Sequence, residues 1–183
     1  MHTEYRHPLF SDLLETLLQN TPRSGQFHAA AVAERVLDDI SSQHSYPAAT
    51  LVQKILDAVS EAPVASLQGT EGVLDTTDAA HDLRQLIEDL TESASMPVDA
   101  VGEPVHTVEQ LSKLFDVSTK TISRWRRQGL IGRKFVIDGR KRVGFLKSSV
   151  DRFISSNRKQ IERGSRFRQM TDQERDQIIS EAK

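Results

Sequence analysis

The sequence predicts a mainly α-helical protein that combines an acidic helical bundle with a small winged helix-turn-helix domain containing a two-stranded β-hairpin. Three observations predict this fold. Apolar residues recur at helical spacing through residues 1–92, two short helices joined by a tight turn follow at residues 107–131, and two β-prone runs meet at an Asp-Gly pair, Asp138-Gly139.

The charge of the chain changes sign along its length. Residues 1–100 carry 5 Lys/Arg against 16 Asp/Glu, a net charge of −11, and residues 101–183 carry 19 against 10, a net charge of +9. The whole-chain net charge of −2 conceals this division. Because phosphates attract a basic surface and repel an acidic one, we expect nucleic acid to bind only the C-terminal part.

Four helical patterns fill the acidic part, and each has a narrow apolar stripe. A helix cannot shield such a stripe alone, so we expect the four helices to pack as a bundle. A loop is expected at residues 66–78, between the third and fourth helices. The stripes consist of Phe10, Leu13, Leu14, Leu17 and Leu18; Ala29, Val32, Ala33, Val36, Leu37 and Ile40; Leu51, Val52, Ile55, Leu56 and Val59; and Leu83, Leu86, Ile87 and Leu90.

A linker is expected at residues 93–104, which hold two prolines and a glycine without helical periodicity. The predicted domains are therefore an acidic helical domain at 1–92, the linker at 93–104, and a winged helix-turn-helix DNA-binding domain at 105–163. A basic segment with a helix is expected at 164–183, where Thr171 and Glu174 have the spacing of a capping box.

The helix-turn-helix is predicted at residues 107–131. Its first helix, at 107–115, has Leu111, Leu114 and Phe115 on one face. Its second helix follows Ser118, a good N-cap, and ends at Gly129, which suits a left-handed backbone.

The second helix has two different sides. At about 100° per residue, Ser118, Ile122 and Trp125 share one side, so we expect Ile122 and Trp125 to be core anchors. The opposite side holds Lys120, Ser123, Arg124 and Arg127. This basic side is therefore expected to stay free for DNA.

The wing is predicted at residues 133–145. Phe135 and Ile137 alternate on one face of the first run, and Val143 and Phe145 on one face of the second. Pairing these faces suggests a loop of about three residues around 138–140, with the register left open. A following helix, capped by Ser148 or Ser149, would close the core with Val150, Phe153, Ile154 and Ile161.

Residues 104–168 hold 17 Lys/Arg against 5 Asp/Glu, a net charge of +12. Arginine can hydrogen-bond guanine or neutralise phosphates, and Ser or Thr can reach either, so the sequence leaves open which residue does which. The basic wing could reach the backbone or a minor groove. The candidate DNA contacts are Ser118, Thr119, Lys120, Thr121, Ser123, Arg124, Arg126, Arg127, Arg133, Lys134, Arg140, Lys141 and Arg142.

The sequence contains no recognisable motif for catalysis or for cofactor binding. There is no cysteine, the six histidines are scattered, and the chain has no phosphate-binding glycine motif or nucleophile elbow. We therefore expect no enzyme activity, no cofactor and no metal site. The N-terminal residues lack a signal-peptide pattern, and no apolar run would span a bilayer, so a cytoplasmic location is expected, without membrane contact.

Two family resemblances follow from these motifs. The pattern Val117-Ser118-x-x-Thr121-Ile122-x-x-Trp125-x-x-x-Gly129-Leu130, followed by a basic wing, resembles the winged helix-turn-helix of the MerR and excisionase superfamily over roughly residues 105–155. Segments 118–126, 138–145 and 167–175 are similar to the N-terminal extension of one bacterial group of sigma-70-family factors. The second resemblance implies promoter DNA and RNA polymerase as partners, and a chain that is either the N-terminal part or a stand-alone relative of such a factor.

The main interpretation is therefore a bacterial transcription factor that binds double-stranded DNA. An excisionase-like architectural protein that bends DNA and a protein–protein adapter are the alternatives. The charge division adds a hypothesis of an intramolecular contact, in which the acidic bundle folds over the basic face and weakens DNA binding until a partner removes it.

Overall fold

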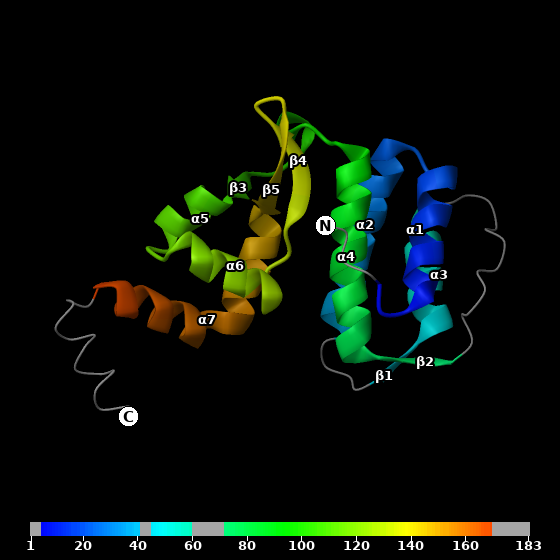
Figure 1. The fold of residues 1–183 in the computed structure, drawn as a ribbon, viewed down its shortest axis with the longest axis horizontal. Helices are drawn as coiled ribbons and strands as arrows, with labels where there is room; N and C mark the ends of the chain where they lie inside the picture. Colours follow the sequence, from blue (N-terminus) through cyan, green and yellow to red (C-terminus); the bar gives the residue numbers. More distant parts are fainter. Residues whose placement is uncertain (1–4, 41–44, 60–71, 170–183) are drawn as a thin grey trace. The chain divides into compact units, whose positions relative to one another are not determined.

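The computed structural model describes residues 5–40, 45–59 and 72–169 and confirms the mainly helical fold class (Figure 1). The chain forms two compact units. Unit 1 combines Met1–Val101 with Arg133–Arg142, and unit 2 combines Gly102–Gly132 with Val143–Lys183. The chain therefore passes from one unit to the other three times.

The described part of unit 1 contains four α-helices, which lie side by side in Figure 1. They are α1 (Pro8–Asn20), α2 (Arg23–Ile40), α3 (Ala48–Leu56) and α4 (Thr76–Ala94). Strands β1 (Ser45–Pro47) and β2 (Val73–Asp75) form an antiparallel pair at one end of these helices. The four helices confirm the sequence prediction, whereas the two strands are too short to produce a detectable alternation.

Three details of unit 1 differ from the prediction. Helix α4 begins inside the expected loop 66–78, because the Asp75 carboxylate accepts hydrogen bonds from the backbone N–H groups of Thr77 (2.8 Å) and Asp78 (3.2 Å). Val59 lies beyond the end of α3, and Leu18 is 38% exposed at the edge of the α1 stripe.

The expected linker at 93–104 contains regular structure. Helix α4 continues to Ala94, and a 3₁₀ turn, η1, covers Val98–Ala100. The Met96 carbonyl accepts a hydrogen bond from the Val136 N–H at 2.9 Å. The passage from unit 1 to unit 2 falls between Val101 and Gly102, within this segment.

Unit 2 contains the helix-turn-helix and part of a small sheet. Its elements are β3 (Val105–Thr107), α5 (Val108–Leu114), α6 (Thr119–Arg127), the second half of β5 (Arg140–Leu146) and α7 (Lys147–Gln169). Strand β4 (Arg133–Ile137) belongs to unit 1. The strand order is β3-β5-β4, and β3, which the sequence did not predict, is antiparallel to β5 with His106 opposite Phe145.

The hairpin between β4 and β5 has a two-residue loop. Asp138 and Gly139 both have positive φ values, 50° and 72°, as in a type I′ turn. The prediction of about three loop residues was therefore wrong. An Asp-Gly pair tolerates two consecutive left-handed residues, which allows the shorter loop.

Helix α7 is capped from outside the helix. The N–H and hydroxyl of Ser148 donate to the Glu103 carboxylate at 2.8 and 2.9 Å, and α7 already begins at Lys147. Neither serine is therefore the N-cap that the sequence predicted. Helix α7 continues through a non-helical residue, Asn157, to Gln169, and the predicted capping box at 171–174 lies outside the described residues.

Candidate nucleic-acid interface

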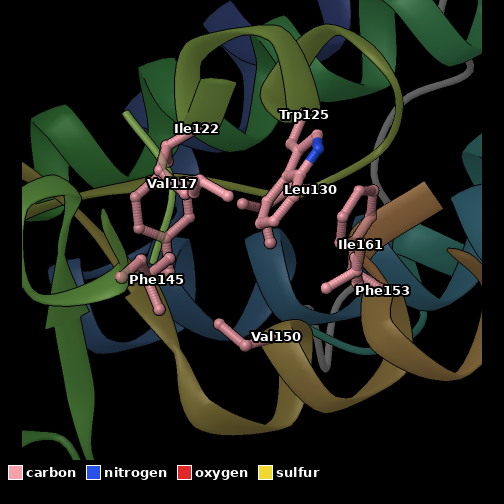
Figure 2. Packing of buried hydrophobic residues seen from close by; sticks show 9 residues of the cluster. Val117, Ile122, Trp125, Leu130, Phe145, Val150, Phe153 and Ile161 are labelled. Atoms are coloured by element: carbon pink, nitrogen blue, oxygen red, sulfur yellow. The ribbon is translucent and has the colours of Figure 1, made fainter. Parts of the chain in front are cut away.

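An apolar core fixes the position of α6 within unit 2. Ile122 and Trp125 are buried, which confirms both predicted anchors. The Trp125 ring contacts Phe115 and Phe153, with ring centroids 5.5 and 5.7 Å apart. Figure 2 shows Trp125 directed toward Phe153 and Ile161 of α7. The inner side of α6 is therefore fully used in packing.

Helix α5 begins as its sequence suggests but exposes one predicted core residue. The Thr107 hydroxyl accepts from the Gln110 N–H at 3.2 Å, and the Gln110 side chain accepts from the Thr107 N–H at 2.8 Å, which completes a capping box. Leu111 is buried, but Leu114 is 64% exposed. The prediction of a core position for Leu114 was wrong, because α5 ends at this residue.

The turn between α5 and α6 is held by Ser112. The Ser112 carbonyl accepts from the Val117 N–H at 3.0 Å, and its hydroxyl donates to the Val117 carbonyl at 2.5 Å. Asp116 takes a left-handed φ of 48°, which Asp tolerates better than most residues. Val117 is buried, so this turn is anchored in the core and orients α6.

Both ends of α6 form the caps that the sequence predicted. The Ser118 hydroxyl accepts from the Thr121 N–H at 3.2 Å. Gly129 has a φ of 123°, and the N–H groups of Gly129 and Leu130 donate to the carbonyls of Arg126 (3.4 Å) and Trp125 (2.9 Å). These two bonds define a Schellman motif, so α6 has fixed ends as well as a fixed inner side.

The outer side of α6 is exposed and basic. Lys120, Ser123, Arg124 and Arg127 are all exposed, and at 100° per residue they lie opposite Ile122 and Trp125. The Ser123 hydroxyl donates to the Thr119 carbonyl at 3.1 Å, which leaves its lone pairs able to accept. A helix with anchored apolar residues and an exposed basic side has the form required to enter a major groove.

Four other predicted contacts lie at the start or on the flanks of α6. Ser118 and Thr119 are exposed, whereas Thr121 and Arg126 are half-buried. The Thr121 hydroxyl lies 3.0 Å from the Ser118 hydroxyl, within the cap. A Cβ on Gly132 would approach Arg126 Nε to 3.2 Å, so Arg126 packs closely over this glycine.

The hairpin does not expose all of the predicted cations. Arg140, Lys141 and Arg142 are exposed, and Lys134 is half-buried. Arg133 is only 3% exposed and forms an ion pair with the buried Glu34 within unit 1. A side chain in this position does not reach a phosphate, so Arg133 is removed from the candidate DNA contacts.

The comparison with known families supports this site. Residues 107–158 match the family model of a helix-turn-helix domain. The chain thus carries a helix-turn-helix domain of the DNA-binding kind. No curated protein and no solved structure matches the chain.

Other kinds of site find no support among the described residues. In that part of the chain, no group of three or more His, Asp or Glu side chains is placed to hold a metal ion. Within the same ranges, no helix is both long enough and apolar enough to cross a membrane.

Proposed function

We propose that this protein is a non-enzymatic transcription factor that binds double-stranded DNA by placing α6 in the major groove. The observation that carries the proposal is the two-sided form of α6. Its inner side is fixed by Ile122 and Trp125, and its outer side presents Lys120, Arg124 and Arg127 to solvent. Exposed arginines on a fixed helix suit recognition of guanine edges and phosphates.

The test is DNA binding by the full chain with single substitutions on this side. Arg124→Ala and Arg127→Ala are each expected to weaken specific binding by about 1–3 kcal/mol where the arginine reads a base, without a change in thermal unfolding. Specific sites are first selected from a random duplex library, and affinity is then measured by fluorescence anisotropy across a salt series. Arg35→Ala, which removes an exposed arginine from α2, is the matched control.

The salt series is expected to show whether Arg124 and Arg127 each bind a phosphate or read a base. An arginine that binds a phosphate lowers the steepness of the salt dependence by about one when it is removed, whereas one that reads a base relaxes specificity at one position. If DNA affinity changed neither with these two substitutions nor with salt concentration, the result would instead favour a function as a protein–protein adapter.

We also propose that the DNA-binding domain is of the MerR and excisionase type and that the protein acts in bacterial transcription together with RNA polymerase. The pattern from Val117 to Leu130 and the three segments similar to sigma-factor extensions support this proposal. Co-purification of core RNA polymerase with the full chain would test it. An architectural role is distinguished by a DNA-bending assay, in which strong bending without promoter-linked activity would contradict the transcription proposal.

A further inference from the structure

Strand β4 is anchored in unit 1 by a buried ion pair. Arg133 Nη2 lies 2.5 Å from Glu34 Oε2, and the two side chains are 3% and 2% exposed. The Arg133 guanidinium also lies over the Phe27 ring, 5.2 Å from its centroid. Phe27 in turn contacts Phe135 edge-on at 5.9 Å, so α2 and β4 share one packed face.

The backbone of β4 is fastened to α4 and to the residues that follow it. The Lys134 N–H donates to the Thr91 hydroxyl at 3.0 Å, and the Val136 N–H donates to the Met96 carbonyl at 2.9 Å. Thr91 is buried, and its hydroxyl donates to the Ile87 carbonyl at 2.8 Å. This bond orients the hydroxyl oxygen so that it can accept the N–H of Lys134. These contacts make β4 part of the bundle.

The exposed tip of the hairpin is carried by the same unit. Arg140, Lys141 and Arg142 follow the turn and belong to unit 1. Lys141 Nζ donates to the Glu92 carbonyl at 2.9 Å, near the C-terminal end of α4, where a cation is favoured by the helix dipole. The unit that holds most of the acidic residues therefore also displays a cluster of cations.

The Arg133–Glu34 pair fixes geometry more effectively than it adds stability. Arg133 Nε and Nη1 are buried without a hydrogen-bond partner in the described part of the chain, so the pair does not recover the full cost of burying the guanidinium. Separation of the pair is nevertheless unfavourable, because the Arg133 guanidinium would remain buried without its carboxylate partner. The pair thus ties β4 to α2.

We propose that Arg133 is a positioning residue for DNA binding. Its ion pair with Glu34 holds β4 on unit 1, so that Arg140, Lys141 and Arg142 bind DNA phosphates as part of that unit. This inference rests on the proposed DNA-binding function. It assigns the bundle a supporting role in DNA binding, opposite to the inhibitory role in the hypothesis drawn from charge alone.

The test compares three variants of the full chain on a mixed-sequence duplex, with affinity measured across a salt series. The tip variant, Arg140→Ala with Lys141→Ala and Arg142→Ala, is expected to weaken binding severalfold. It should also reduce the slope of log affinity against log salt by about 0.9 for each phosphate that is no longer neutralised. Glu34→Gln is expected to reduce the slope similarly. The combination of both changes is expected to bind no more weakly than the tip variant.

Hydrogen exchange shows whether Glu34→Gln acts through β4. The Lys134 and Val136 amides are expected to lose protection, while the amides of α6 keep theirs. Glu15→Gln removes an exposed carboxylate from α1 and is the matched control. Replacing both partners by apolar residues, Glu34→Leu with Arg133→Met, removes both buried charges and is expected to restore β4 protection and the wild-type salt slope.

The outcomes separate this inference from the proposed function. Stronger DNA binding by Glu34→Gln, an unchanged slope, or additive losses in the combined variant would overturn the positioning role. If Arg124→Ala and Arg127→Ala leave binding unchanged, the DNA-binding proposal itself fails. Should Glu34→Gln not fold, Thr91→Val removes the acceptor of the Lys134 N–H, and it must then produce the reduced slope for the inference to stand.

Deletion of residues 1–100 would test the hypothesis that the acidic bundle inhibits DNA binding, and the contacts of β4 affect the result expected from it. Removal of residues 1–100 also removes Glu34, Thr91 and Met96, which are the ion-pair and hydrogen-bond partners of Arg133, Lys134 and Val136 in β4. A decrease in affinity in that deletion is therefore expected from the positioning role, whereas an increase would contradict it.

Discussion

The two units differ in whether they bury charged residues. In unit 1, Glu34, Asp82 and Arg133 are buried and hold separate segments together. By contrast, in the parts of unit 2 whose side-chain burial is described, residues 102–132, 143–158 and 161, no charged side chain is buried, and α6 directs Lys120, Arg124 and Arg127 to solvent. Both units therefore expose basic residues, but unit 1 also uses charged residues to hold its interior together.

Arg124 and Arg133 show why this difference arises. Helical periodicity places Arg124 about 100° from Trp125, so the guanidinium leaves the core. Strand periodicity of two places Arg133 on the same face as Phe135, and that face is buried. Arg124 is thus exposed and Arg133 buried, although both come from basic runs close together in the sequence. The periodicity of the helix or strand that contains each arginine determines its environment.

The largest expected effect distinguishes the two sides of α6. Trp125→Ala should lower the free energy of unfolding by about 3–5 kcal/mol, because it opens a cavity between Phe115 and Phe153. Denaturant unfolding followed by circular dichroism measures this change. Arg124→Ala is the control on the outer side, and an equal destabilisation in that variant would contradict the two-sided description.

A somewhat smaller effect is expected for the buried arginine. Arg133→Ala removes the guanidinium that pairs with the buried Glu34 carboxylate, which should cost about 3 kcal/mol, the lower end of the range for such pairs. The lower end applies because two of the Arg133 nitrogens already lack partners in the described part of the chain. Glu34→Leu with Arg133→Met should be close to neutral by thermal unfolding, and a large destabilisation in the double variant would count against this account.

A third prediction separates stability from DNA binding at the start of α6. Ser118→Ala should cost about 1 kcal/mol of stability, because the Thr121 N–H then has no side-chain acceptor. Ser118→Asp keeps the cap but places a negative charge near the expected phosphates. Ser118→Asp should therefore keep wild-type thermal stability and lose DNA affinity, and unchanged affinity would exclude Ser118 from the interface.

The smallest expected effect concerns pH and unit 1. Burial, together with a 2.7 Å hydrogen bond from the hydroxyl to Asp89, raises the pKa of Tyr5 above its ordinary value of 10.0. Since the folded state then holds the proton more tightly than the unfolded state, this contribution is present below pH 10 and is lost as pH rises further. Unfolding measured from pH 8 to 11 should show a shallower decline for Tyr5→Phe than for the wild type, and identical curves would contradict the linkage.

Most of the helix-turn-helix could be predicted from sequence because its signals are local. Ser118, Gly129 and the spacing of Ile122 with Trp125 are enough to define the start, the end and the inner side of α6. The same holds for Thr107 and Gln110 at the start of α5.

The features that the sequence prediction missed depend on residues far apart in the chain. Glu103 caps α7 from 45 positions away, and Arg133 pairs with Glu34 from 99 positions away. Neither partner lies within the spacing of a helix turn or a strand pair. One signal of the buried position of Arg133 is nevertheless present in the sequence. Arg133 lies two residues before Phe135 and four before Ile137, so in a strand it shares the face predicted for these apolar residues.

The three passages of the chain between the units have a consequence for synthesis on the ribosome. Proteins made from consecutive domains can complete the N-terminal domain before the next one emerges. Here β4 and the tip of the hairpin, which complete unit 1, are translated after α5 and α6. The face of the bundle that contains Phe27 and Glu34 therefore stays uncovered until Arg133 and Phe135 have left the exit tunnel, so that unit 1 completes its packing only after α5 and α6 have been made.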